Sequence, residues 1–219
     1  MIVDLHCDTI SEIYKNKGIS LKENDLMIDI NKMKKSDVLL QCFAMFTYLK
    51  EVDSPYKYVN ELIDLYEDEI EKNSSDIAFA KSYSDIQKNK ENNKISAFLT
   101  IEEGEAIEGS IENLIHFYNR GVRMITLTWN FENCIGFGNK RIIENGECVG
   151  YTPDKDNGLK PFGFEVVEKM EELGIIVDVS HLSDAGIYDI IDIAKKPFVA
   201  SHSNARTVCN HPRNLTDDM

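Results

Sequence analysis

The stretch Ile175-Ile176-Val177-Asp178-Val179-Ser180-His181 is an apolar run of strand type that closes on a histidine. A second stretch, Pro197-Phe198-Val199-Ala200-Ser201-His202, repeats this pattern, and its histidine lies 21 residues further along the chain. The amphipathic residues between the two have the length of a helix, so the pattern predicts a βαβ unit. Such a unit places both imidazoles side by side at the C-terminal edge of a parallel sheet, where α/β proteins build their sites.

The first residues of the chain supply another strand with a polar end, Ile2-Val3-Asp4-Leu5-His6-Cys7-Asp8. Side chains two positions apart on a strand point the same way. His6 and Asp8 are therefore expected to present a nitrogen and a carboxylate to a common point.

Apolar runs of strand type alternate with amphipathic runs of helix type along the chain. Further strands are expected at 38–46, 94–101 and 122–128, and further helices from Ser54-Pro55 onward, near 83–89, at 110–120, before Gly174 and at 184–195. About six β/α units in this order imply a parallel sheet with helices outside it. A doubly wound open sheet is the alternative. Polar strand ends from units one, three, five and six surround one point only if the sheet closes, so we predict a (β/α)8 TIM barrel.

Residues 1–219 are expected to form a single barrel domain. A complete barrel of this kind usually needs about 250 residues, so strands 7 and 8 are expected to be missing from this chain. A long polar loop, roughly 130–158, is expected to be functional or mobile because of its length.

The composition narrows the classes of function. The net charge of −14, without a basic cluster, argues against a nucleic-acid surface. No run approaches the roughly 18 apolar residues of a membrane span, and the first residues do not form a signal peptide. The five cysteines are irregularly spaced, which indicates free thiols and a cytoplasmic location rather than a disulfide framework.

The polar strand ends together predict a metal site. Zinc-type divalent ions take imidazole and carboxylate ligands, and such groups are offered by His6, Asp8, His181 and His202. The strand at 94–101 adds Glu102, Glu103 and Glu105 at its end. Of these, Glu102 shares a face with Thr100 and projects at the strand end itself. Glu102 is therefore the expected bridging carboxylate if two ions bind.

Several stretches match one known family in their order along the chain. They are Asp4-Leu5-His6-Cys7-Asp8 and residues 101–107, 121–130, 158–163, 177–181, 201–205 and 211–218. In these stretches the chain resembles the membrane dipeptidase (renal dipeptidase) family, peptidase family M19, and in particular its bacterial-type members. The resemblance covers essentially the whole chain, and it implies that the barrel is of the metal-dependent hydrolase type and that residues 1–219 form a single metallohydrolase barrel domain.

The resemblance implies a binuclear zinc site and a substrate site. His6 and Asp8 would hold one ion, His181 and His202 the other, and Glu102 would bridge them. Arg213 matches the arginine that receives the carboxylate of a dipeptide, and Trp129 and Asn214 would also contact substrate. Trp129 stands where many members have a histidine, and the family's catalytic aspartate would lie beyond Met219.

The function that this resemblance implies is hydrolysis of the amide bond of a small dipeptide by a water molecule that two metal ions activate. One alternative is another amidohydrolase-type activity, on lactones or other amides, with the same metals. A different alternative is a truncated fragment that binds metal with little or no turnover. The sequence leaves open whether the protein forms a homo-oligomer.

Overall fold

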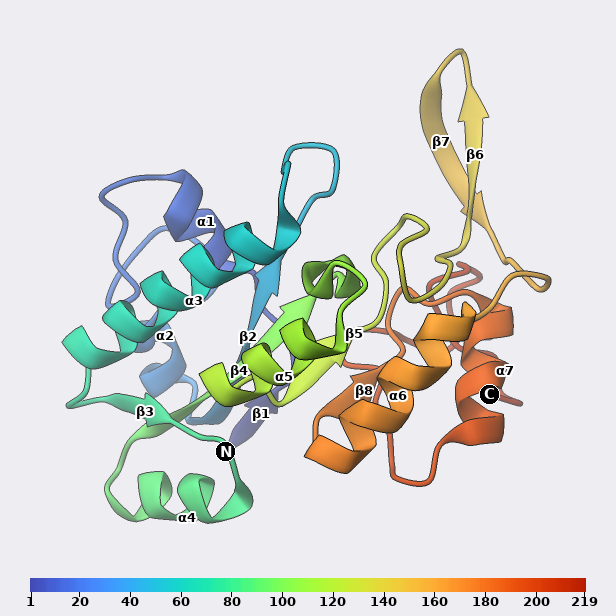
Figure 1. Ribbon diagram of the computed structural model, residues 1–219. Coiled ribbons are helices and arrows are strands. Elements are labelled where there is room, and N and C mark those ends of the chain that lie inside the picture. The colour runs from blue at the N-terminus through green and yellow to red at the C-terminus, as the bar shows by residue number, and fades with distance from the viewer. The chain divides into compact units, whose positions relative to one another are not determined.

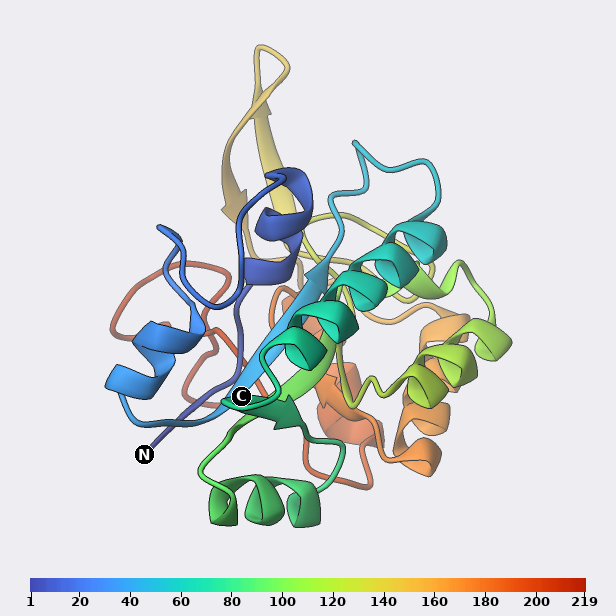
Figure 2. The same cartoon turned by 90° about the vertical axis from the view of Figure 1, so that its left-hand side faces the viewer.

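The computed structural model describes residues 1–219 (Figures 1 and 2). Contacts between Cα atoms group the chain into two compact units. The first unit comprises residues 1–101 and 117–123, and the second comprises residues 102–116 and 124–219. The boundary after residue 101 falls within the strand Ile95–Glu102, and the last residue of this strand, Glu102, belongs to the second unit.

The first unit is built on parallel strands. Its elements are β1 (Ile2–Asp4), α1 (Thr9–Lys15), α2 (Ile30–Lys35), β2 (Val38–Phe46), α3 (Pro55–Lys72), β3 (Ile77–Phe79), α4 (Tyr83–Glu91) and β4 (Ile95–Glu102). The strand order is β1-β2-β4, and β3 also pairs with β4. The β1–β2 and β3–β4 pairs are parallel. Helix α3 packs along β2, as Figure 2 shows.

The second unit continues the alternation of strands and helices. A 3-10 turn at Gly104–Ile107 precedes α5 (Ile111–Arg120), β5 (Met124–Thr126), β6 (Lys140–Glu144), β7 (Glu147–Thr152), α6 (Pro161–Leu173), β8 (Ile176–Asp178) and α7 (Asp184–Ile193). The last residues of α5 belong to the first unit. Strands β5 and β8 are parallel, whereas β6 and β7 form an antiparallel hairpin that extends away from α6 and α7 (Figure 1).

Helix α3 shows how the sequence determines an element. Ser54 caps it by accepting a hydrogen bond from the backbone N–H of Lys57, and Pro55 occupies the first turn, where its missing N–H costs nothing. The predicted apolar stripe is buried; its members are Val59, Leu62, Ile63, Tyr66 and Ile70. Burying one such side chain fully stabilises the fold by about 1.5–3 kcal/mol, so packing of this face dominates the stability of α3.

Helix ends also follow from local residues. Gly174 ends α6 in the left-handed conformation with a φ of 80°, which glycine adopts without a steric penalty. Ser183 begins α7 by accepting a hydrogen bond from the backbone N–H of Gly186. The helices expected at 54 onward, near 83–89, at 110–120, before Gly174 and from 184 are all confirmed.

The predicted strand at 197–202 is wrong. The chain there makes only a single parallel bridge, between Val199 and Asp178. The predicted strand at 2–8 is shorter than expected, because β1 ends at Asp4. The structure still contains six β/α units, because β3, a strand that was not predicted, precedes the predicted helix α4. Strand β3 has only three residues, too few for a recognisable alternation.

The hairpin β6–β7 lies inside the segment that was predicted as an irregular loop. Asn145 and Gly146 form its two-residue turn, with φ values of 50° and 86°. A turn with positive φ at both central residues strongly favours Asn-Gly, and this pair is visible in the sequence. The hairpin was therefore predictable.

Replacing Gly163 by alanine tests the packing of α6. An added Cβ would lie 2.1 Å from the carbonyl oxygen of Ile135, so backbone must move. We expect a destabilisation of about 1–3 kcal/mol, as for other overpacked sites. Gly150→Ala is the control, since its nearest neighbour would be 3.7 Å away, and we expect a change within about 0.5 kcal/mol. Urea unfolding of both variants measures the difference, and equal stabilities would contradict the packing shown.

Candidate metal centre

Three potential metal-ligand atoms converge within the second unit. The Glu102 Oε1 atom, at the end of β4, lies 3.1 Å from His181 Nε2 and 3.4 Å from His202 Nε2. The two Nε2 atoms are 3.1 Å apart. Glu102 and His181 are both buried. The two histidines that the sequence placed at neighbouring strand ends thus contact one carboxylate.

The far side of the His181 ring is held by Asn130. His181 Nδ1 lies 2.8 Å from Asn130 Oδ1, while the amide nitrogen of Asn130 donates to the hydroxyl of Tyr151 at 3.2 Å. Because the amide oxygen only accepts, Nδ1 carries the proton and the Nε2 lone pair is directed at Glu102.

The far side of the His202 ring is held by a serine. His202 Nδ1 lies 2.7 Å from Ser201 Oγ, and that hydroxyl donates its own hydrogen to Asp178 Oδ2 at 2.5 Å. Ser201 therefore accepts from Nδ1, which leaves a lone pair on His202 Nε2 as well.

The donor set fits a divalent cation. Two imidazole lone pairs and a carboxylate oxygen face one another at 3.1–3.4 Å, and acceptors at this spacing need a cation or protons between them. Ligating histidines typically have their second nitrogen fixed by a hydrogen bond, as both histidines do here.

The environment of His181 keeps its imidazole neutral. Burial lowers the pKa of His181 to about 4, and the positive charge of Arg213 acts in the same direction. Glu102 opposes this shift, because it would accept a hydrogen bond from the protonated ring. A neutral imidazole is the form that binds a metal. The His181 backbone has a φ of 70°, a left-handed conformation that is uncommon outside glycine and typical of functional sites.

The first unit contains the other predicted pair. His6 Nε2 and Asp8 Oδ1 are 3.4 Å apart, although both residues lie beyond the end of β1. The backbone N–H of His6 donates to Asp4 Oδ1 at 3.2 Å. Asp8 Oδ1 is shielded from solvent and accepts no hydrogen bond, which is unusual for a carboxylate oxygen and fits a cation ligand.

The neighbouring carboxylates have other partners. Glu103 accepts hydrogen bonds from the side chain of Asn133 and from the backbone N–H of Trp129, the latter at 3.1 Å. Burial raises the pKa of Glu103 to about 7, and these hydrogen bonds oppose the rise. Glu105 accepts from the backbone N–H of Cys134 at 2.6 Å. Of the three glutamates, Glu102 is the one that contacts the imidazoles, and its role as a bridging ligand stays a prediction.

The residues predicted to bind substrate, Arg213, Asn214 and Trp129, differ in the contacts that they make within the protein. Arg213 reaches Ser203 Oγ and the His202 carbonyl at 3.4 Å each, and burial lowers its pKa. Asn214 uses both ends of its amide on the loop backbone, accepting from Asn204 at 3.0 Å and donating to Cys209 at 2.8 Å. The Trp129 ring lies 5.9 Å from the His181 ring, centroid to centroid.

Three residues that position the histidines were not singled out from the sequence: Asn130, Asp178 and Ser201. Asp178 had a visible signal, because a carboxylate inside an apolar strand needs several hydrogen-bond partners. Ser201 and Asn130 had none, since a serine or asparagine at a strand end is common in loops.

No helix of the described chain is long and apolar enough to cross a membrane.

Comparison with solved structures confirms the class of fold. A metallopeptidase of family M19, the dipeptidase AC, superposes with a TM-score of 0.86 at 23% identity over 99% of this chain and 67% of its own. A metallopeptidase from Rhodobacter sphaeroides gives a TM-score of 0.88 at 21% identity, over 99% of this chain and 69% of its own. The fold is therefore the α/β barrel type of these metallopeptidases, as predicted.

The sequence comparisons identify the family. The family described as membrane dipeptidase (peptidase family M19) matches residues 1–219. An uncharacterized dipeptidase of Schizosaccharomyces pombe is 33% identical over 237 aligned positions, which cover 100% of this chain and 55% of that protein. The chain belongs to the membrane dipeptidase family, M19. It spans about half the length of this curated relative and about two thirds of the two solved metallopeptidases.

Replacing Asp178 by asparagine tests whether its hydrogen bonds stabilise the segments that carry His181 and His202. Its two oxygens accept four hydrogen bonds, and an amide would turn an NH₂ group toward donors. We expect a loss of about 1–3 kcal/mol in the free energy of unfolding. In the control, Asp189→Asn, the carboxylate accepts one bond, from the Leu159 N–H at 2.7 Å, and an amide oxygen replaces it. Urea denaturation compares the two, and an Asp178 variant as stable as the control would contradict this role.

Proposed function

We propose that this protein is a metal-dependent dipeptidase and that the cluster of Glu102, His181 and His202 is part of its metal centre. The observation that carries the proposal is the convergence of one carboxylate and two oriented imidazole nitrogens within 3.4 Å of one another. Membership of the M19 family supports the reaction class.

The residues that would hold the metal ions follow the family pattern. His6 and Asp8 would ligate one ion, His181 and His202 a second, and Glu102 would serve both. Zinc is the proposed metal, because imidazole nitrogens and carboxylate oxygens are its usual protein ligands. Bound divalent ions would supply Lewis acidity that activates a water molecule and polarises the scissile amide.

Arg213 would bind the free carboxylate of the dipeptide. A guanidinium offers two parallel N–H donors that match both carboxylate oxygens. Arg206, seven residues earlier, is already engaged in such a pair with Asp184, at 2.7 and 2.8 Å. Arg213 makes only contacts of 3.4 Å, so its donors can turn to a ligand. Binding the terminal carboxylate would favour dipeptides over longer peptides.

Trp129 and Asn214 would border the substrate. The indole beside His181 offers an apolar surface and one N–H donor, and it cannot accept a proton. Its place in the family pattern is often a histidine, so this chain would bind the substrate there by packing. A cytoplasmic location is also proposed; it is supported by the five cysteines, which are all free thiols.

Replacing Glu102 by glutamine tests the metal assignment. An amide lacks the negative charge that a cation requires, so we expect the purified variant to lose at least one equivalent of metal. Glu105→Gln is the matched control and should keep the full metal content, since Glu105 binds the backbone of Cys134. Metal analysis of protein purified without chelators gives the result. The reverse pattern would show that another glutamate is the ligand.

Replacing Arg213 by methionine tests carboxylate recognition. We expect kcat/KM for a dipeptide such as Ala-Ala to fall by about 30-fold or more, chiefly through KM. The carboxamide of the same dipeptide lacks the charge and should be a poor substrate for the wild type, with little further loss in the variant. A variant that still prefers the free acid over the amide by the wild-type ratio would exclude Arg213 from this role.

A further inference from the structure

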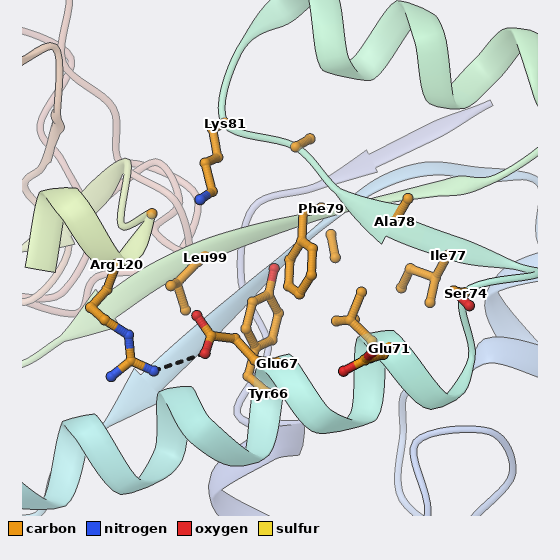
Figure 3. A pocket seen from close by; sticks show the side chains of 14 residues that line it. Tyr66, Glu67, Glu71, Ser74, Ile77, Ala78, Phe79, Lys81, Leu99 and Arg120 are labelled. Atoms are coloured by element: carbon orange, nitrogen blue, oxygen red, sulfur yellow. Dashed lines mark hydrogen bonds and ion pairs between the residues drawn. The ribbon is translucent and has the colours of Figure 1, made fainter.

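The first unit contains a cavity that lies among α3, β3, β4 and the end of α5 (Figure 3). Its volume is about 370 Å³, and none of the candidate metal ligands lines it. Three small residues leave room for it, because its lining includes Gly121 and the buried Ala80 and Ala97. The remaining walls are mainly apolar side chains of Ile70, Ile77, Phe79 and Leu99.

A buried hydroxyl without a partner points into this cavity. Tyr66 is 1% exposed, and its hydroxyl makes no hydrogen bond. Figure 3 shows that hydroxyl directed between Leu99 and Phe79. Native structures seldom leave a buried polar group unsatisfied. Burial also raises the pKa of Tyr66 well above its usual range, so the hydroxyl stays protonated and available as a donor.

The aromatic side chains define the shape of a ligand. The rings of Tyr66 and Phe79 have centroids 5.5 Å apart and planes at 62°. Phe79 is 39% exposed, so part of its apolar surface remains accessible at the border of the cavity. A flat aromatic body would cover it and would gain the edge-to-face geometry that aromatic rings prefer.

The charges around the cavity define the charge of a ligand. Arg120 is neutralised by ion pairs with Asp64 and Glu67 at 2.7 and 3.0 Å. Lys81 lies against Gly121, where an added Cβ would meet Lys81 Cε at 2.7 Å. The Lys81 backbone N–H donates to Asp85, but no carboxylate lies within ion-pair distance of its ammonium group. Glu71 lies on the opposite side of the cavity from Lys81 in Figure 3.

We propose that this cavity is a second binding site, for a small aromatic acid. The aromatic body lies against Phe79 and Leu99, a hydrogen-bond acceptor on the ring receives the Tyr66 hydroxyl, and the acid group pairs with Lys81. The site is separate from the proposed metal centre in its residues, so a ligand here does not compete for the metal-binding side chains.

Three para-substituted benzene derivatives test each contact separately. The probe 4-acetylbenzoate has both the acceptor and the charge, 4-isopropylbenzoate lacks the acceptor, and 4-acetylbenzamide lacks the charge. Binding to the purified protein is followed by titration in two-dimensional NMR. We expect saturable binding of 4-acetylbenzoate, with shifts at Phe79, Ala97 and Leu99, and weaker binding of the other two compounds.

Matched variants assign the two polar contacts. Tyr66→Phe removes only the hydroxyl, so affinity for 4-acetylbenzoate should fall by about 2- to 10-fold while affinity for 4-isopropylbenzoate is unchanged. Lys81→Met should remove the preference for benzoate over benzamide, about 2- to 5-fold. Tyr83→Phe and Lys88→Met are the controls, and thermal unfolding verifies that each variant folds. The absence of saturable binding, or preferences that survive both variants, would overturn the proposal.

Discussion

The carboxylate of Asp178 is the constraint on which the second unit depends. It is fully buried at the end of β8 and accepts hydrogen bonds from the hydroxyls of Thr126 and Ser201 and from the backbone N–H groups of Ser180 and Ser201. These donors come from β5, from the residues after β8 and from the segment that follows α7. An isolated buried charge is very costly, whereas one with four donors organises every segment that supplies them.

The hydrogen bonds to Asp178 explain how His202 is positioned although residues 197–202 do not form a strand. The segment at 197–202 has only one ladder bridge, at Val199, so side-chain bonds to Asp178 replace the missing backbone pairing. The same carboxylate turns the chain at Ser180, directly before His181 takes its left-handed conformation. The backbone N–H groups of its neighbours Ser180 and Leu182 both donate hydrogen bonds, and a strained backbone persists where the surrounding structure fixes it.

The sequence predicted the helices well because their signals are local. A cap residue, a proline in the first turn and an apolar stripe are all read within one segment, as α3 shows. The strand at 197–202 failed because pairing depends on a distant partner, and Asp178 takes that role with its side chain instead. The roles of Asn130 and Ser201 were equally invisible, since each depends on which imidazole the fold brings beside it. Residue types at strand ends could be predicted, but their hydrogen-bond partners could not.

Buried polar atoms of this chain differ in whether they have hydrogen-bond partners, and this difference bears on both proposed ligand sites. Both carboxylate oxygens of Asp178 accept hydrogen bonds, and we assign this residue a structural role. Five buried side-chain oxygens make no hydrogen bond, among them Asp8 Oδ1 and Tyr66 Oη. A buried oxygen without a hydrogen bond destabilises the fold where the packing around it leaves no space. Beside another potential metal ligand or an open cavity, the same oxygen can bind a ligand. Asp8 lies beside His6, and Tyr66 faces a cavity. The same physical criterion therefore supports both proposals, a cation site at Asp8 and an organic ligand site at Tyr66.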